Sequence, residues 1–106
     1  MVYTLTVYTY GVLDRFAGFE WDVHNVRHIA LHGVSPADVE DAVTNRNVVI
    51  PAGPGKTGKR WKLIGRTAAG PYLVIVFTGR RGRFRTVTAY TMNQSERKLY
   101  APEIES

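Results

Sequence analysis

The chain has 106 residues, a hydrophobic content of 44% and a net charge of +5. This length predicts a single domain over residues 1–106, with a core that needs neither disulfides nor a metal. The sequence contains no cysteine, which excludes a disulfide-rich scaffold and suits a reducing cytoplasm. The longest apolar run, residues 72–77, is far too short to cross a bilayer, so we expect a soluble cytoplasmic protein without membrane contact.

The charge is distributed unevenly between the two halves of the chain. Residues 1–50 carry a formal charge of −3, whereas residues 51–106 carry +8. This split predicts positive potential on the C-terminal half, which favours a polyanionic partner such as RNA or DNA. The alternative is ordinary solubilising charge, since basic side chains alone identify no ligand.

The N-terminal residues form an extension, residues 1–18, with strand-like character. Residues 2–10 alternate threonine and tyrosine with Leu5 and Val7, and Gly11 interrupts the pattern. The segment is either an added edge strand or a poorly ordered extension.

Two short helices are predicted next, over residues 23–31 and 36–44. Asp22 can cap the first, whose apolar residues recur at three- and four-residue spacing. Gly33 can supply the left-handed residue that ends this helix, and Ser35 can cap the second. The two helices are therefore expected to meet at a tight corner.

The second half of the chain predicts an antiparallel meander and a closing helix. Turn signals separate four predicted strands, near residues 48–50, 60–65, 72–78 and 83–90. Residues 51–59 are rich in glycine, proline and lysine and predict a flexible basic loop. Asn93 and Glu96 can cap a last helix near residues 94–100, which Pro102 is expected to end. The fold class is therefore α+β, with the helices segregated to one face or end of the sheet.

An ordered set of short motifs carries a family resemblance. The chain contains Phe19-Glu20-Trp21-Asp22, then Asn25, then His32-Gly33-Val34-Ser35. Further matches follow in Leu63-Ile64-Gly65, in the apolar strand 73–78, in Arg83-Phe84-Arg85 and in Glu96-Arg97 with Tyr100. In this order and spacing, residues 19–100 resemble the BrnT toxins, small ribonucleases of bacterial type II toxin–antitoxin pairs. Residues 1–18 stay outside the resemblance, and residues 101–106 form a tail.

The resemblance implies a RelE-like ribonuclease fold and a metal-independent endoribonuclease that inhibits translation. No cofactor is expected. The implied partners are RNA and a small antitoxin that covers the basic sheet and carries a ribbon-helix-helix DNA-binding part. The oligomeric state is left open between a homodimer and a toxin–antitoxin hetero-oligomer.

Metal-free RNA cleavage needs a base for the 2′-hydroxyl proton, a cation beside the phosphate and an acid for the leaving 5′-oxygen. His32 is the best acid or base, because an unperturbed imidazole titrates near neutral pH. Arg83 and Arg85 are expected on one face of a strand, about 7 Å apart, where they can stabilise the phosphate. Arg97 and Tyr100 lie one turn apart on the last helix and can orient RNA or assist proton transfer.

Structural roles compete with each of these assignments. His32 can instead make a hydrogen bond at the helix corner. Arginines on an edge strand can serve only to prevent aggregation, which is the stronger explanation for Arg80 and Arg81 at the turn.

Further basic residues are candidates for non-specific contact with RNA phosphates. They are Lys56, Lys59, Arg60, Lys62, Arg66, Arg80 and Arg81. Gly55-Lys56-Thr57 also suggests a phosphate-binding loop, but such a loop needs a glycine where this chain has Ile50. A nucleotide-binding loop is therefore excluded.

Three histidines at four-residue spacing, His24, His28 and His32, raise the question of a zinc site. Cysteine is absent, and no carboxylate stands at the spacing of a known metal motif. No metal site is therefore expected, and packing, capping or RNA chemistry is the preferred role for the histidines.

Two positions depart from the family pattern. Tyr90 stands where arginine usually closes the third strand, and Pro71 stands where arginine is common. Tyr90 can stack on a base or donate a proton, which makes it a further catalytic candidate. If the missing arginine is essential, the chain is instead a catalytically lapsed relative, a basic RNA-binding or protein-interaction module. A third alternative is a structural domain whose N-terminal strand pairs with another chain.

Overall fold

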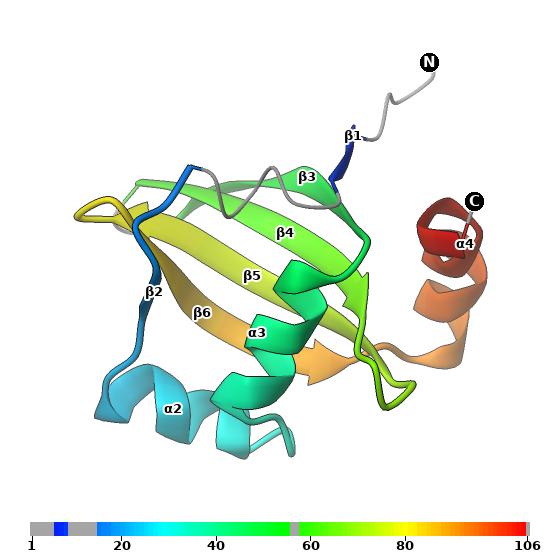
Figure 1. Cartoon of the computed structure of the whole chain (residues 1–106), viewed down its shortest axis with the longest axis horizontal. Helices are drawn as coiled ribbons and strands as arrows, with labels where there is room; N and C mark the ends of the chain where they lie inside the picture. Colours follow the sequence, from blue (N-terminus) through cyan, green and yellow to red (C-terminus); the bar gives the residue numbers. More distant parts are fainter. Residues whose placement is uncertain (1–5, 9–14, 56–57, 106) are drawn as a thin grey trace.

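The computed structural model of the protein describes residues 6–8, 15–55 and 58–105. Its six strands form one sheet in the order β1-β3-β4-β5-β6-β2 (Figure 1). The elements, in chain order, are β1 (Thr6–Tyr8), β2 (Phe19–Glu20), α2 (Val23–Ala30), α3 (Pro36–Thr44), β3 (Asn47–Gly55), β4 (Gly58–Arg66), β5 (Tyr72–Arg80), β6 (Arg83–Thr91) and α4 (Gln94–Glu105). The predicted α+β class is confirmed. Within the described part of the chain, no helix is long and apolar enough to cross a membrane.

The sheet consists of the predicted meander with one short strand added at each edge. β3, β4, β5 and β6 pair antiparallel in chain order. β1 pairs antiparallel with β3, which confirms an added edge strand over residues 6–8, while the remainder of the predicted segment 2–10 lies outside the described residues. β2 pairs parallel with β6 through Phe19 and Glu20, so the sheet is mixed.

The caps predicted for the first two helices are confirmed. The Asp22 carboxylate accepts the backbone N–H groups of His24 and Asn25, and the Ser35 hydroxyl accepts that of Asp38. Gly33 has φ +73°, the left-handed conformation that the turn between the helices requires. Both helices therefore begin directly after their predicted caps, and α2 ends before the turn at Gly33.

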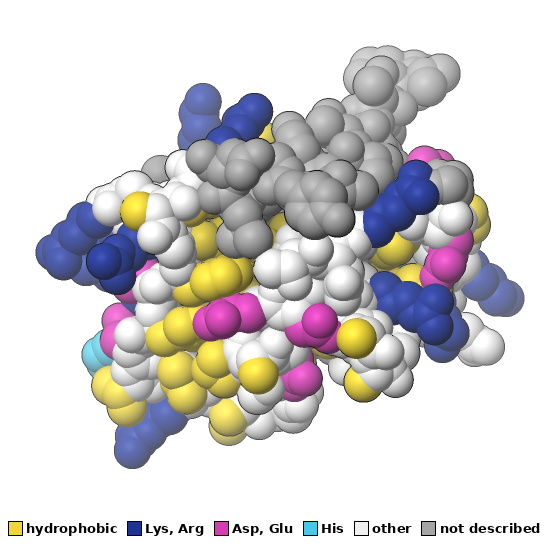
Figure 2. All heavy atoms as spheres, in the orientation of Figure 1, with side chains coloured by type: hydrophobic (Ala, Val, Ile, Leu, Met, Phe, Trp, Pro, Cys, Tyr) yellow, Lys and Arg dark blue, Asp and Glu magenta, His cyan; other side chains and the backbone are white. Residues whose placement is uncertain are grey.

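α2 and α3 cover one face of the sheet and enclose the larger core. Its buried residues are Ile29, Val34, Val39, Ala42, Val43, Leu63, Leu73, Ile75, Phe77, Phe84 and Ala89. Gly65 allows α3 to approach β4, because a Cβ at this position would lie 3.0 Å from the carbonyl oxygen of Ala42. In the view of Figure 2, acidic and apolar side chains occupy the centre, where Figure 1 shows α3, and most lysines and arginines lie at the rim.

α4 covers part of the opposite face. Ile104 is 3% exposed and packs with Val48, Ile64, Tyr72, Val74 and Met92 in a second core. The contacts of α4 with the sheet are chiefly with β3 and β4. Among the described residues no helix covers the rest of this face, which we term the open face, and its half-buried side chains are Arg60, Lys62, Val76, Thr78, Arg85 and Thr88.

A bulge in β6 decides which of its side chains lie on the open face. The register shifts between Val76 and Phe77 of β5, which leaves Val87 as an additional residue on β6. Side chains alternate between the two faces along a strand, and an extra residue reverses that alternation. Arg85 and Tyr90, an odd number of positions apart, therefore share one face of the sheet.

The prediction of a flexible loop over residues 51–59 is wrong where the structure describes it. β3 continues to Gly55, β4 begins at Gly58, and the two strands pair as a hairpin. Pro51 lies outside Asn47–Val49, the residues of β3 that pair with the described part of β1, so its missing N–H removes no hydrogen bond from that pairing. Gly53, at φ +83°, accommodates the register shift beside it.

The prediction that Pro102 ends the last helix is also wrong. α4 continues to Glu105 with Pro102 inside it, although proline removes one backbone donor from the helix. The last turn is fixed by tertiary contacts: Ile104 is buried, and Glu105 accepts hydrogen bonds from the Tyr72 hydroxyl and from Arg66. Packing beyond the proline compensates for the missing helical hydrogen bond.

Candidate functional site

A cleft of about 710 Å³ lies on the open face beside α2. It is lined by His24, Asn25, His28, Arg60, Thr78, Gly79, Arg80, Arg85, Thr86 and Val87. Its walls come from α2, from β4 and from the β5–β6 hairpin, which are three segments far apart in the sequence. Guanidinium groups beside imidazoles suit a phosphodiester, since the first bind phosphate and the second exchange protons near neutral pH.

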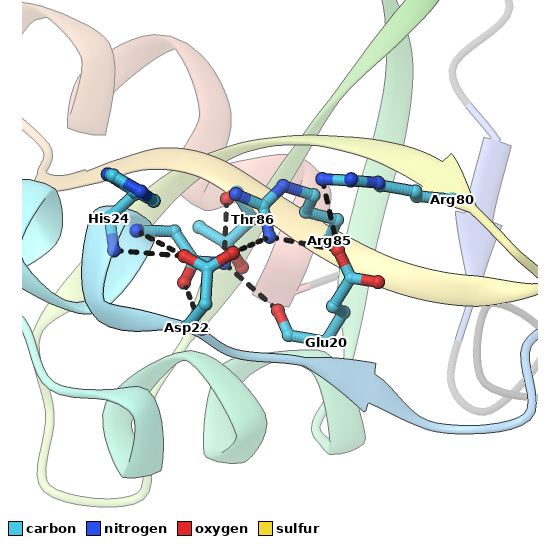
Figure 3. A network of polar contacts seen from close by, with 7 residues as sticks. Glu20, Asp22, His24, Arg80, Arg85 and Thr86 are labelled. Carbon is cyan, nitrogen blue, oxygen red and sulfur yellow. Dashed lines mark hydrogen bonds and ion pairs between the residues drawn. The ribbon is translucent and has the colours of Figure 1, made fainter.

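An ion-pair network holds two arginines of this cleft, Arg80 and Arg85 (Figure 3). The Arg85 guanidinium donates to Glu20 Oε1 at 2.9 Å and to Asp22 Oδ2 at 2.8 Å. Arg80 lies 3.5 Å from the same oxygen of Glu20. The Arg85 side chain is 16% exposed and that of Glu20 is 19% exposed, so their pair is largely shielded from solvent.

The network perturbs the acidity of its members. Hydrogen bonding from Arg85 lowers the pKa of Asp22 from 3.8 to about 2, with a further contribution from the backbone N–H of Asn25. Hydrogen bonding to Asp22 in turn raises the pKa of Arg85. Asp22 therefore remains ionised throughout the physiological pH range and keeps Arg85 in place.

Asn25 joins α2 to the two strands beside it. Its amide nitrogen donates to the carbonyl oxygens of Glu20 at 2.9 Å and Thr86 at 3.2 Å, and its amide oxygen accepts the backbone N–H of Asp22 at 2.8 Å. The side chain is buried, so these bonds form away from solvent. Together with the burial of Ile29, this amide fixes the position of α2 and of the histidines that it carries.

The three histidines form a row that begins in the cleft and leaves it. His24 and His28 line the cleft, whereas His32 lies beyond it, with its ring centroid 5.8 Å from that of His28. The His32 ring is also 6.3 Å from the ring of Tyr90. Over the described ranges, no group of three histidine, cysteine, aspartate or glutamate side chains is arranged to hold a metal ion.

Tyr90 lies between His32 and α4. Its hydroxyl donates to Glu96 Oε2 at 3.2 Å, and burial, followed by the charge of Glu96, raises its pKa. Tyr90 and Tyr100 both pack against the second core. Arg97 instead lies over the ring of Tyr72, 4.9 Å from its centroid. Of these residues, Tyr90 is the one whose ring lies beside a histidine, His32.

The predicted pair of Arg83 and Arg85 is divided between two environments. The register places both on the same face of β6, opposite Arg80 and Thr78 of β5. Arg83 is exposed, whereas Arg85 is held by two carboxylates. The two guanidiniums are therefore not an equivalent free clamp.

The other predicted RNA contacts are dispersed. Arg60 and Arg80 line the cleft, Lys62 lies on the open face, and Arg81 is exposed at the β5–β6 turn. Lys59 is exposed, and its carbonyl oxygen accepts the Thr78 hydroxyl at 2.8 Å. Arg66 lies at the other end of the sheet, where it pairs with Glu105 at 3.0 Å. Lys56 lies outside the described residues.

Glu20, Asp22, His24 and His28 are not among the site residues predicted from the sequence. Glu20 enters there as part of a family motif, Asp22 as part of that motif and as a helix cap, and the two histidines as members of the histidine row. The position of Glu20 beside Arg85 follows from the parallel pairing of β2 with β6, which no local pattern specifies.

Comparison with known proteins identifies the family of the chain. Searches of curated proteins and of solved structures each found no significant match. The family described as "Ribonuclease toxin, BrnT, of type II toxin-antitoxin system" matches residues 21–96, a segment that contains α2, α3 and the whole β3–β6 meander. This segment is well over half of the chain, and the protein therefore belongs to the BrnT family of ribonuclease toxins.

Proposed function

We propose that the protein is an endoribonuclease that cleaves RNA without a metal ion and inhibits translation in the cytoplasm. The observation that carries this proposal is the cleft in which His24 and His28 occur together with Arg60, Arg80 and Arg85. Imidazoles can move protons at neutral pH, and guanidiniums can stabilise the charge that develops on an attacked phosphate. Metal-free RNA cleavage requires these two capacities.

In the proposed reaction the RNA backbone enters the cleft and supplies its own nucleophile. The 2′-oxygen loses its proton and attacks the adjacent phosphorus, the bond from phosphorus to the 5′-oxygen breaks, and an imidazolium protonates the leaving oxygen. The products are a 2′,3′-cyclic phosphate and a 5′-hydroxyl. Arg80 and Arg85 would contact the phosphate, and His28 is the cleft imidazole nearest to His32.

His32 retains its predicted role in proton transfer, now together with His28. Its side chain is exposed, and its ring lies edge-on to that of His28 and tilted against that of Tyr90. No side-chain hydrogen bond of His32 is present in the described part of the chain, which weakens the alternative role at the helix corner. Tyr90 and Tyr100 would contact a base or sugar next to the cleft, whereas Arg83, Arg81 and Lys62 would contact flanking phosphates.

As a member of a type II toxin–antitoxin family, the protein has a protein antitoxin as its partner. We propose that this antitoxin carries a ribbon-helix-helix DNA-binding part and covers the open face. The support is electrostatic, because the open face carries Arg60, Lys62 and Arg85 and an inhibitor there would block access to the cleft. The mass of the co-purified complex would distinguish a hetero-oligomer from a toxin homodimer.

The experiment that tests the proposal is cleavage of single-stranded RNA by the purified chain in excess EDTA. We expect cleavage to persist and to yield 2′,3′-cyclic phosphate ends. Expression in bacteria should slow growth and reduce protein synthesis, and co-expression of the antitoxin should restore both. Cleavage that stops in EDTA and returns with zinc would contradict the metal-free mechanism.

His32→Gln provides the residue-level test. Glutamine can form hydrogen bonds but cannot move protons near neutral pH, so cleavage should fall by about a hundredfold or more while the melting temperature stays nearly constant. His28→Gln should behave in the same way. Full activity in the His32 variant, combined with a lower melting temperature, would give His32 a structural role.

A catalytically lapsed relative is the second candidate function. The observation that favours it is that two carboxylates already occupy Arg85. The family resemblance also implies an arginine at the position of Tyr90. In that case the wild-type chain would bind RNA and cut nothing in the same assay.

A further inference from the structure

The carboxylate of Glu20 is bound on one side only. Within the described part of the chain its two ion pairs, with Arg85 at 2.9 Å and with Arg80 at 3.5 Å, both use Oε1. Among the described residues Oε2 has no hydrogen-bond partner. Figure 3 shows the carboxylate directed toward these two guanidiniums from the neighbouring strand. Glu20 therefore presents a free, negatively charged oxygen beside two arginines that line the cleft.

We propose that Glu20 is the general base of the cleft, and that its Oε2 accepts the 2′-hydroxyl proton of an RNA whose phosphate is held by Arg80 and Arg85. This inference rests on the proposed ribonuclease function and adds the group that starts the reaction. A phosphate bound to the two guanidiniums lies next to their other ligand, the Glu20 carboxylate. The 2′-hydroxyl belongs to the sugar on that phosphate, so it is brought within reach of the same carboxylate.

The proton balance of the step is complete with groups of this chain. The O–H bond of the 2′-hydroxyl breaks and its proton passes to Glu20, while the 2′-oxygen forms a bond to phosphorus. The bond from phosphorus to the 5′-oxygen breaks, and that oxygen takes a proton from the His28 imidazolium. Exchange with water then returns Glu20 to the carboxylate and His28 to the imidazolium, and no oxidant or reductant takes part.

Asp22 is unsuited to this role although it belongs to the same network. Its Oδ1 accepts the backbone N–H groups of His24 and Asn25, and its Oδ2 accepts Arg85. Both oxygens are therefore occupied, and a pKa of about 2 makes the carboxylate a weak base. Asp22 positions Arg85 and leaves proton transfer to Glu20.

The surrounding charge allows a carboxylate to work next to a phosphate. Three arginines line the cleft, Arg60, Arg80 and Arg85. Two carboxylates, Glu20 and Asp22, form ion pairs with Arg80 and Arg85. The excess of positive charge offsets the repulsion between carboxylate and phosphate. It also stabilises the additional negative charge of the transition state, in which the phosphate has gained an oxygen.

The test compares Glu20→Gln with Asp22→Asn in the full-length chain. We measure single-turnover cleavage of a defined single-stranded RNA between pH 4 and pH 9, together with binding of its uncleavable 2′-deoxy analogue. Glu20→Gln should reduce the cleavage rate by about a hundredfold or more and abolish the acidic limb of the pH profile. Its affinity for the analogue should be unchanged or higher, because a negative charge is removed. Asp22→Asn should retain the acidic limb, whatever its effect on the rate.

Glu20→Asp is the second variant, because it keeps a carboxylate with a shorter reach. It should recover the acidic limb at a reduced rate. The inference is overturned if Glu20→Gln retains the acidic limb, whether or not its rate falls, since the carboxylate then only positions the arginines. If the wild-type chain cuts no RNA, the proposed ribonuclease function is wrong, and the role of Glu20 is wrong with it. Binding of the 2′-deoxy analogue would then show whether the inactive chain still binds RNA.

Discussion

Asp22 combines two roles in one carboxylate. One oxygen caps α2 through two backbone N–H groups, and the other holds Arg85 of β6 at 2.8 Å. The same residue therefore starts the helix that carries the histidines and fixes an arginine of the cleft. Local helix capping and tertiary charge pairing are coupled at this position.

The lowered pKa of Asp22 predicts a pH-dependent stability. Its value is about 2 in the folded chain against 3.8 for the free side chain, so its contribution is complete above about 4 and is lost as the pH falls through about 2. Asp22→Asn keeps the capping oxygen and removes the charge. The variant should therefore be less stable than the wild type at pH 7, and the two should converge toward pH 2.

Chemical unfolding of both proteins at several pH values measures this difference. A gap that stays constant from pH 7 to pH 2 would show that Asp22 acts through its polar cap alone, without a contribution from its charge.

At the level of elements, α4 shows how a short helix is stabilised by its last turn. Ile104 is 3% exposed and lies in the second core, whereas Leu99 of the same helix is 65% exposed. Glu105 adds hydrogen bonds from Tyr72 and Arg66 at the same end. Burial beyond Pro102, rather than helix propensity, keeps the end of α4 on the sheet.

Ile104→Ala should therefore destabilise the protein by about 2–4 kcal/mol, because truncation of a buried isoleucine leaves a cavity. Leu99→Ala is the matched control on the same helix and should change stability by less than about 0.5 kcal/mol, since exposed side chains contribute little. Thermal unfolding of the two variants measures both values. Equal effects would show that the last turn does not pack on the sheet.

At the level of the whole molecule, the two faces of the sheet divide stability and function. α2 and α3 bury the larger core on one face of the sheet. On the other face α4 covers one end, and among the described residues no helix covers the open face, where the cleft lies. Part of the basic charge of the C-terminal half lies on that open face and at the β5–β6 hairpin, whereas Arg66, which pairs with Glu105 of α4, and Arg97 of α4 lie beside Tyr72. The molecule can therefore bind a long polyanion without disturbing its larger core.

This division predicts the salt dependence of RNA binding. Arg83→Ala should reduce the slope of log affinity against log salt concentration by about 0.7 for single-stranded RNA, the value for one lost phosphate contact. Lys98→Ala on α4 is the control and should leave the slope unchanged. Arg85→Ala should lower the melting temperature as well, because it leaves Glu20 and Asp22 without their shared partner. An unchanged slope for Arg83→Ala would show that this side chain makes no contact with RNA.

Local patterns in the sequence were sufficient for much of this protein. The helices after Asp22 and Ser35, the central strands of the meander and the basic character of the second half all follow from caps, periodicity and charge. The helices and strands depend on residues within a few positions of one another, whereas the charge and the motif order are properties of the linear sequence. These features needed no knowledge of contacts distant in sequence.

Tertiary structure alone decided the composition of the cleft. The bulge at Val87 places Tyr90 on the face of Arg85, and the parallel pairing of β2 brings Glu20 to the same arginine. Strand register and the continuation of α4 past Pro102 depend on packing between distant segments. Such packing is a property of the whole sheet, because a shift of one residue moves every following side chain to the other face.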